Sequence, residues 1–198
     1  IACLINTMLT VLVIDESRSR AGEICAGLAL AGYQVAAILA GSQNLSAEVE
    51  KLQPDVILID TDSPSRDTLE NLSAMDKNMP RPVVIFTQED GQTSIRDALK
   101  AGVSAYIVDG LDSKRIKPIL DVAMARFEDT QALRRELNEV SQKLSDRKLV
   151  DKAKGVLMKA RGLDEDAAYH AMRKLAMERG QSMAKVARDV IDMARLLL

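Results

Sequence analysis

The chain has 198 residues, a formal net charge of −2 and 47% hydrophobic residues, which is enough for one or two domains with apolar cores. Aromatic residues make up only 3% and tryptophan is absent, which argues against an RNA-binding sheet that stacks bases on aromatic side chains. No apolar run reaches about 18 residues, so no membrane-spanning segment is predicted, and the isolated Cys3 and Cys25 suit reduced thiols in a cytoplasmic protein.

The front of the chain alternates short apolar runs with segments of helical pattern. Residues 1–8 are interpreted as an extension or non-native start, because the pattern of a strand begins directly after Met8. The apolar runs lie at 10–15, 34–39, 55–60, 82–87 and 105–108, and the helical segments at 18–31, 44–52, 66–76, 92–101 and 112–125. Strands that are apolar on both faces and separated by helices predict a parallel sheet covered on both sides. Five such units predict an α/β fold with a flavodoxin-like (CheY-like), doubly wound, five-stranded parallel sheet.

Acidic and hydroxyl side chains stand at the ends of three of these strands. The first strand ends in Asp15 and Glu16, the third in Asp60 and the fourth in Thr87. Sites in such sheets form at the carboxyl ends of the strands, and neighbouring carboxylates need a cation between them. Hard oxygen ligands suit Mg²⁺, beside which a carboxylate can accept a phosphoryl group. The plainer alternative is that acids simply favour junctions between strand and loop.

Residues 9–125 resemble the receiver domain of two-component response regulators on these same positions. The resemblance implies that Asp60 is the phosphoacceptor and that Thr87 is the switch hydroxyl. It also implies a Mg²⁺ site. Its ligands would be Asp15, Glu16, Asp60 and the backbone carbonyl of Asp62.

The sequence departs from the receiver pattern after the fifth strand. Receivers carry a lysine there that neutralises the phosphoryl group, whereas this chain reads "AYIVDGLDSKR" and has Asp109 at that position. Asp109 would repel a phosphoryl group, and Lys114 is the nearest basic residue in the next helix. Two modes of control therefore stay open, phosphorylation of Asp60 and control by a protein partner.

A helical pattern without glycine or proline follows Pro118 as far as Gly155. Within it lie Leu133, Leu137, Val140 and Leu144, whose spacing of four, three and four residues is that of a coiled-coil seam. We expect one long helix whose segment 126–146 pairs with a second copy to form a homodimer. The alternative is an amphipathic helix packed back onto its own domain.

The last quarter of the chain is basic. Residues 146–198 hold 12 basic and 8 acidic side chains, whereas residues 1–145 hold 15 and 21. On a helical wheel, residues 147–161 place two basic rows on either side of Gly155, opposite an apolar face. The rows are Arg147, Lys154 and Arg161, and Lys148, Lys152 and Lys159. They suit a phosphate backbone, and the alternative is a solvated lysine-rich face.

Residues 147–198 are predicted to form a small all-α domain of three helices. The motifs "AKGVLM", "RG", "AAYHAMRKLAM" and "VA" (153–158, 161–162, 167–177 and 186–187) are similar to the ANTAR domain of transcription antiterminators. This resemblance implies a dimer that binds hairpins in a leader mRNA and blocks a terminator. The candidate RNA contacts are Arg147, Lys152, Lys154, Arg161 and Arg173.

The whole arrangement resembles the AmiR/NasT family of antiterminators, and within it the regulators of nitrate and nitrite assimilation. That implies a nitrate-sensing regulatory protein, or a sensor kinase, as partner. One alternative is a phosphorylation-controlled response regulator whose helical output domain binds DNA. A phosphatase-like enzyme would need a general base beside Asp60, and none is visible, so no enzymatic activity is predicted.

Overall fold

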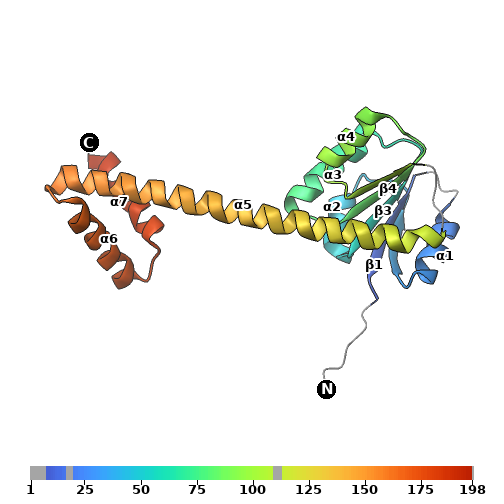
Figure 1. The fold of residues 1–198 in the computed structure, drawn as a ribbon, viewed down its shortest axis with the longest axis horizontal. Coiled ribbons are helices and arrows are strands. Elements are labelled where there is room, and N and C mark those ends of the chain that lie inside the picture. Colours follow the sequence, from blue (N-terminus) through green and yellow to red (C-terminus); the bar gives the residue numbers. More distant parts are fainter. Residues whose placement is uncertain (1–7, 17–19, 109–112, 198) are drawn as a thin grey trace, which may run out of the picture. The chain divides into compact units, whose positions relative to one another are not determined.

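The computed structural model describes residues 8–16, 20–108 and 113–197, and Figure 1 shows the course of the chain. The chain divides into two compact units, Ile1–Gln131 and Ala132–Leu198. Most of the predicted N-terminal extension lies outside the described residues. So does Asp109, the residue at the position of the receiver lysine. No helix among the described residues combines the length and the hydrophobicity needed to cross a bilayer.

The first unit contains a five-stranded parallel sheet in the order β2-β1-β3-β4-β5, which confirms the predicted fold. The strands are β1 (Thr10–Asp15), β2 (Gln34–Leu39), β3 (Val56–Asp60), β4 (Val83–Thr87) and β5 (Ala105–Val108). All residues of β3 and β4 are buried, as is β1 after Thr10, which explains why these segments are apolar throughout.

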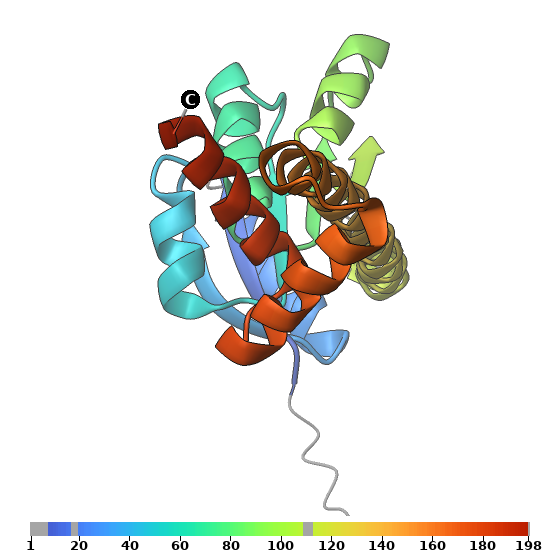
Figure 2. The same ribbon diagram turned by 90° about the vertical axis from the view of Figure 1, so that its left-hand side faces the viewer.

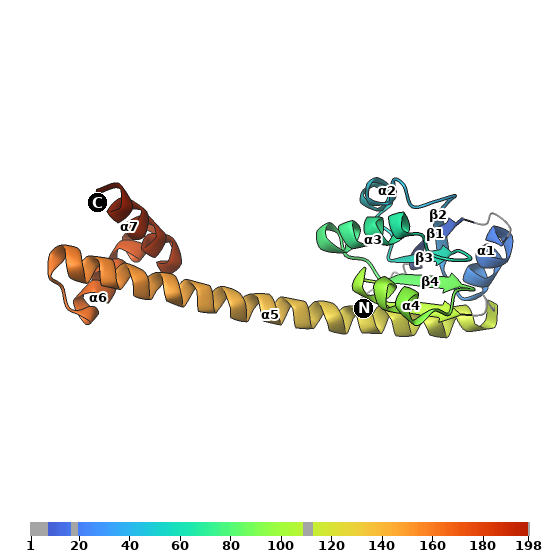
Figure 3. The same ribbon diagram turned by 90° about the horizontal axis from the view of Figure 1, so that it is seen from above.

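Helices cover both faces of this sheet (Figures 1 and 3). They are α1 (Ala21–Leu30), α2 (Leu45–Leu52), α3 (Arg66–Asn78), α4 (Gln92–Lys100) and the first turns of α5 (Ser113–Arg161). One core joins Leu12 and Ile14 of β1 to α2, α3 and α4, and the other joins Val11 and Val13 to α1 and α5. Alternate side chains of one strand thus enter opposite cores, as the pleat requires.

The second unit is a three-helix domain made by the C-terminal part of α5, α6 (Glu165–Arg179) and α7 (Met183–Leu197, dark red in Figure 2). Its core consists of Ala153, Met172, Ala176, Val186, Ala187 and Ile191. Asp164 caps α6 by accepting a hydrogen bond from the Ala167 amide at 2.7 Å. Gly180 ends α6 in the left-handed region, at φ 59°. The helix α5 continues unbroken through Gly155, as expected.

Candidate functional site

Two buried carboxylates lie side by side at the carboxyl edge of the sheet. Asp15 and Asp60 end β1 and β3 and face each other in register, at 1% and 0% exposure. The Glu16 amide also donates to the Asp60 carbonyl at 3.1 Å. We call Asp15, Glu16, Asp60 and Asp62 the acidic pocket. Its two central members meet because parallel neighbouring strands end at the same edge of a sheet.

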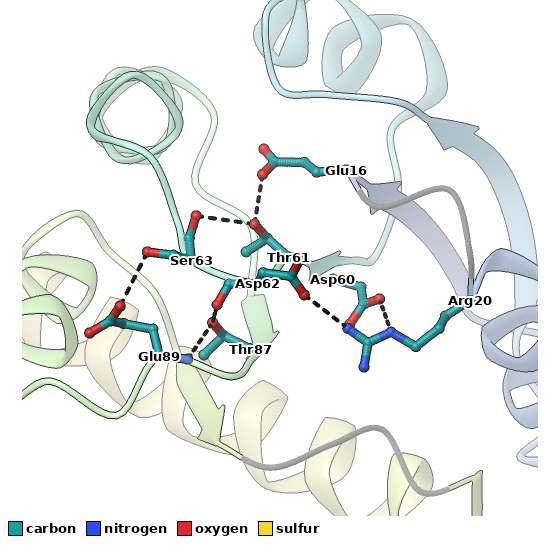
Figure 4. Close-up of polar contacts among 8 residues, drawn as sticks. All are labelled: Glu16, Arg20, Asp60, Thr61, Asp62, Ser63, Thr87 and Glu89. Carbon is teal, nitrogen blue, oxygen red and sulfur yellow. Dashed lines mark hydrogen bonds and ion pairs between the residues drawn. The ribbon is translucent and has the colours of Figure 1, made fainter.

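The Glu16 carboxylate is held away from Asp60 (Figure 4). It accepts hydrogen bonds from the hydroxyls of Thr61 at 2.7 Å and Thr68 at 3.1 Å. Within the described residues, no group of three or more acidic, histidine or cysteine side chains is spaced to hold a metal ion. The structure therefore brings Asp15 and Asp60 together, whereas Glu16 would have to leave two threonines to join them.

The backbone carbonyl of Asp62 is engaged by the loop after β4. It accepts hydrogen bonds from the Thr87 hydroxyl at 2.8 Å and from the Gln88 amide at 3.2 Å. The Thr87 hydroxyl in turn accepts a hydrogen bond from the Glu89 amide at 3.1 Å, and the Tyr106 hydroxyl donates to the Glu89 carbonyl at 3.0 Å. A carbonyl oxygen has two lone pairs, so both acceptor positions of Asp62 are used within the protein.

Sequence reasoning missed Arg20, which contacts the acidic pocket. Its Nε lies 2.9 Å from Asp60 Oδ2, and its NH2 group lies 3.9 Å from Asp62 Oδ1 (Figure 4). Burial raises the pKa of the Asp60 carboxyl; Arg20 opposes this and the Asp15 charge adds to it. The sequence alone carried no signal for this contact, because the helix was predicted to begin at residue 18 and Asp60 is forty positions further along the chain.

The four predicted seam residues of α5 are exposed. The exposed fractions are 67% for Leu133, 69% for Leu137, 58% for Val140 and 54% for Leu144. These side chains are thus left uncovered by the second unit itself, and the pairing of the row with a second copy stays a prediction. A row of apolar side chains at heptad spacing is the pattern that a second helix covers in a coiled coil.

Four of the five predicted RNA contacts are exposed on the second unit, namely Arg147, Lys152, Arg161 and Arg173. The fifth, Lys154, is only 15% exposed, and its Nζ lies 2.8 Å from Asp151 Oδ1 and 2.7 Å from Glu165 Oε1. These ion pairs lower the pKa of Asp151 and raise the pKa of Lys154. Lys154 thus connects α5 to the first turn of α6.

Gly155 lies between the basic rows without a packing reason inside the protein. Beyond the adjacent residues and the backbone of α5 itself, a Cβ atom added there would meet no atom of the described residues within 4 Å. A glycine inside a helix costs about 1 kcal/mol relative to alanine. The described structure thus gives no steric reason for a glycine here, and the close approach of a partner to α5 stays a prediction.

In a comparison with known proteins, each of the two units matches a protein family. Residues 11–126 match the response regulator receiver domain, and residues 138–191 match the ANTAR domain. The chain is an ANTAR-domain response regulator. Proteins of this family are regulators rather than enzymes, in agreement with the prediction that the chain is not an enzyme. The matched segments carry the acidic pocket in one case and the exposed basic residues in the other.

Two relatives of this ANTAR response regulator are named as regulatory proteins. The transcriptional regulatory protein PdtaR of Mycobacterium tuberculosis is 29% identical over 161 residues, which are 81% of this chain and 78% of that protein. The nitrate regulatory protein of Klebsiella oxytoca is 33% identical over 88 residues, 44% of this chain and 22% of that protein. A CheY-like receiver domain protein from Methanospirillum hungatei shares the fold, with a TM-score of 0.55 at 20% identity over 63% of this chain and 99% of its own.

Receiver domains generally bind Mg²⁺ at the acidic pocket, and the residues present fit this ion by their chemistry. Asp15 and Asp60 offer buried carboxylate oxygens, and neither oxygen of Asp60 accepts a well-aligned hydrogen bond. Glu16 and the Asp62 carbonyl are occupied by hydroxyl and amide donors. The donor set is thus the one that Mg²⁺ prefers, while two of the four predicted ligands are committed elsewhere.

Proposed function

We propose that this ANTAR response regulator is an antiterminator that binds hairpins in a leader mRNA and blocks an intrinsic terminator. The observation that carries the proposal is the exposure of four basic residues on the unit that matches the ANTAR domain, namely Arg147, Lys152, Arg161 and Arg173. ANTAR domains bind RNA, and exposed guanidinium and ammonium groups attract a phosphate backbone. The second unit offers Tyr169 as its one aromatic side chain, so charge and shape carry recognition more than stacking does.

We propose that three segments of the chain have separate functions, with the domain boundaries predicted from the sequence. Residues 9–125 form the receiver, 126–146 the dimerising linker and 147–198 the RNA-binding domain. The exposed row from Leu133 to Leu144 supports a homodimer, since each copy leaves the same apolar stripe for the other. A dimer would present two basic surfaces, which suits a leader with paired hairpins.

We propose that nitrate or nitrite assimilation genes are the target and that a nitrate-sensing partner protein controls the receiver. The similarity to the nitrate regulatory protein of Klebsiella oxytoca supports this target. Asp109, in place of the lysine that receivers use to report a phosphoryl group, favours a partner over a phosphorylation switch. Co-purification of the chain with its partner, with and without nitrate, tests this part; binding that nitrate leaves unchanged would contradict it.

The binding function is tested by measuring the affinity of the chain for two nucleic acids. One is an RNA hairpin selected from a library with a randomised loop, and the other is duplex DNA selected in the same way. We expect tighter binding to the hairpins at every salt concentration. The affinity should fall with salt, and Arg161→Gln should reduce the slope of log K against log salt by about 0.7–0.9, the value of one lost phosphate contact. Arg66→Gln, which removes an exposed arginine of the receiver, is the matched control and should leave the slope unchanged. Tighter binding to duplex DNA would favour the alternative of a DNA-binding output domain.

A further inference from the structure

We propose that the Arg20 guanidinium is the resident cation of the acidic pocket and competes with Mg²⁺ for Asp60. In this chain a protein side chain thus holds the place that a metal ion would otherwise take. Arg20 offsets part of the negative charge of the pocket without metal, and Mg²⁺ binds only when Arg20 leaves. This assignment concerns Arg20 and stands independently of what the second unit binds.

The geometry places Arg20 directly on the phosphoacceptor candidate. Asp60 is fully buried, and its Oδ2 atom lies 2.9 Å from Arg20 Nε. The second arm of the guanidinium lies 3.9 Å from the exposed carboxylate of Asp62. Two of the four members of the acidic pocket therefore face one cation, and that cation belongs to the protein (Figure 4).

The electrostatics explain why a cation is needed at this place. The carboxylates of Asp15 and Asp60 end neighbouring strands in register, and both are buried. Two such charges repel each other, and burial makes the repulsion costlier than in water. Mg²⁺ normally relieves this kind of repulsion. Here the positive charge comes from the side chain of Arg20, the N-cap residue of α1.

The position of Arg20 also indicates that its charge serves the pocket and not its own helix. The Arg20 carbonyl accepts the first hydrogen bond of α1, from the Ile24 amide at 3.0 Å, so its backbone is fixed at the positive end of the helix dipole. A guanidinium is unfavourable there on local grounds. Its side chain is nevertheless three-quarters buried, with Asp60 as the closest of its anionic contacts.

Competition follows from the overlap of the two cations at Asp60. A divalent ion bound to Asp60 would share with Arg20 the same carboxylate, and the guanidinium beside it would repel the ion. An opposite charge at this distance shifts the pKa of a carboxyl by about 1–3 units, so it should lower the affinity of a second cation by about tenfold or more.

Mg²⁺ binding to the 198-residue chain, measured by isothermal titration calorimetry, tests the proposal. Arg20→Met removes the cation and keeps an unbranched side chain without a ligand oxygen. We expect it to bind Mg²⁺ at least about tenfold more tightly than the parent chain, and the double variant Arg20→Met/Asp60→Asn to lose that gain. Arg66→Met is the matched control, because Arg66 pairs with the exposed Glu70 in the same unit. It should bind Mg²⁺ as the parent chain does.

Equal or weaker binding by Arg20→Met, or no Mg²⁺ binding by either protein, would overturn the proposal. A second measurement does not depend on the stability of that variant. In the parent chain, the NMR resonance of Arg20 Nε should move when Mg²⁺ shifts the amides of Asp15 and Asp60. An unmoved Arg20 resonance together with shifted amides would contradict competition.

Discussion

The exposed row on α5 leads to a quantitative prediction for the homodimer. Leu137 is 69% exposed in the single chain, so a partner helix would cover about two thirds of its surface. Full burial of a leucine is worth about 1.5–3 kcal/mol, which gives about 1–2 kcal/mol per chain and about 2–4 kcal/mol per dimer. Leu137→Ala removes three of the four side-chain carbons, so we expect a loss of about 1.5–3 kcal/mol, or a dimer weakened roughly 10- to 150-fold.

Sedimentation equilibrium over a range of chain concentrations measures this dissociation constant. The matched control is Leu30→Ala, which truncates a leucine that is 86% exposed on α1 of the first unit and is not part of the row. It should leave the dissociation constant unchanged. A monomeric parent chain, or equal weakening by the two variants, would refute the assignment of the row to the dimer.

Three further predictions concern single side chains. On the proposal that a partner and not a phosphoryl group controls the receiver, Asp60→Ala should leave antitermination and its nitrate response nearly intact; a dead protein in a reporter assay would contradict this. Asp60→Asn should raise the free energy of unfolding at neutral pH, because the pKa of Asp60 is raised in the folded state and the buried charge is unfavourable above that pKa. That gain should vanish in urea titrations as the pH falls below about 3.8, the unfolded value, and a gain that grows on acidification would contradict it. Lys154→Met should lower the melting temperature of the second unit, because it removes two ion pairs, whereas the control Lys152→Met should weaken RNA binding without changing the melting temperature. Equal melting temperatures for these two variants would argue that Lys154 is not a structural connection.

Much of the fold could be predicted because local patterns and tertiary structure agree. The runs that became β1, β3 and β4 are apolar throughout since both faces of these strands are covered. Asp164 and Gly180 mark the ends of α6 by chemistry that acts within a few residues. The meeting of Asp15 and Asp60 followed from the parallel order of the strands alone.

The contacts that were not predicted depend on side chains that are distant in sequence. Arg20 reaches Asp60 forty positions further along the chain, and nothing local in either segment specifies that pairing. The turn of Glu16 toward Thr61 and Thr68 depends on the start of α3, and the pairing of Lys154 with Glu165 depends on the turn between α5 and α6. A helical wheel treats Lys154 and Arg161 alike, although only Lys154 has carboxylates on two helices within reach.

Read-through in a purified transcription reaction tests the central proposal most directly. The template carries the hairpin that binds most tightly to the chain, followed by an intrinsic terminator. Adding the chain should increase the fraction of transcripts that pass the terminator, and a variant with Arg147, Lys152 and Arg161 replaced by glutamine should lose the effect while keeping its melting temperature. Unchanged termination in the presence of bound protein, or equal read-through with the variant, would contradict RNA-based antitermination by this surface.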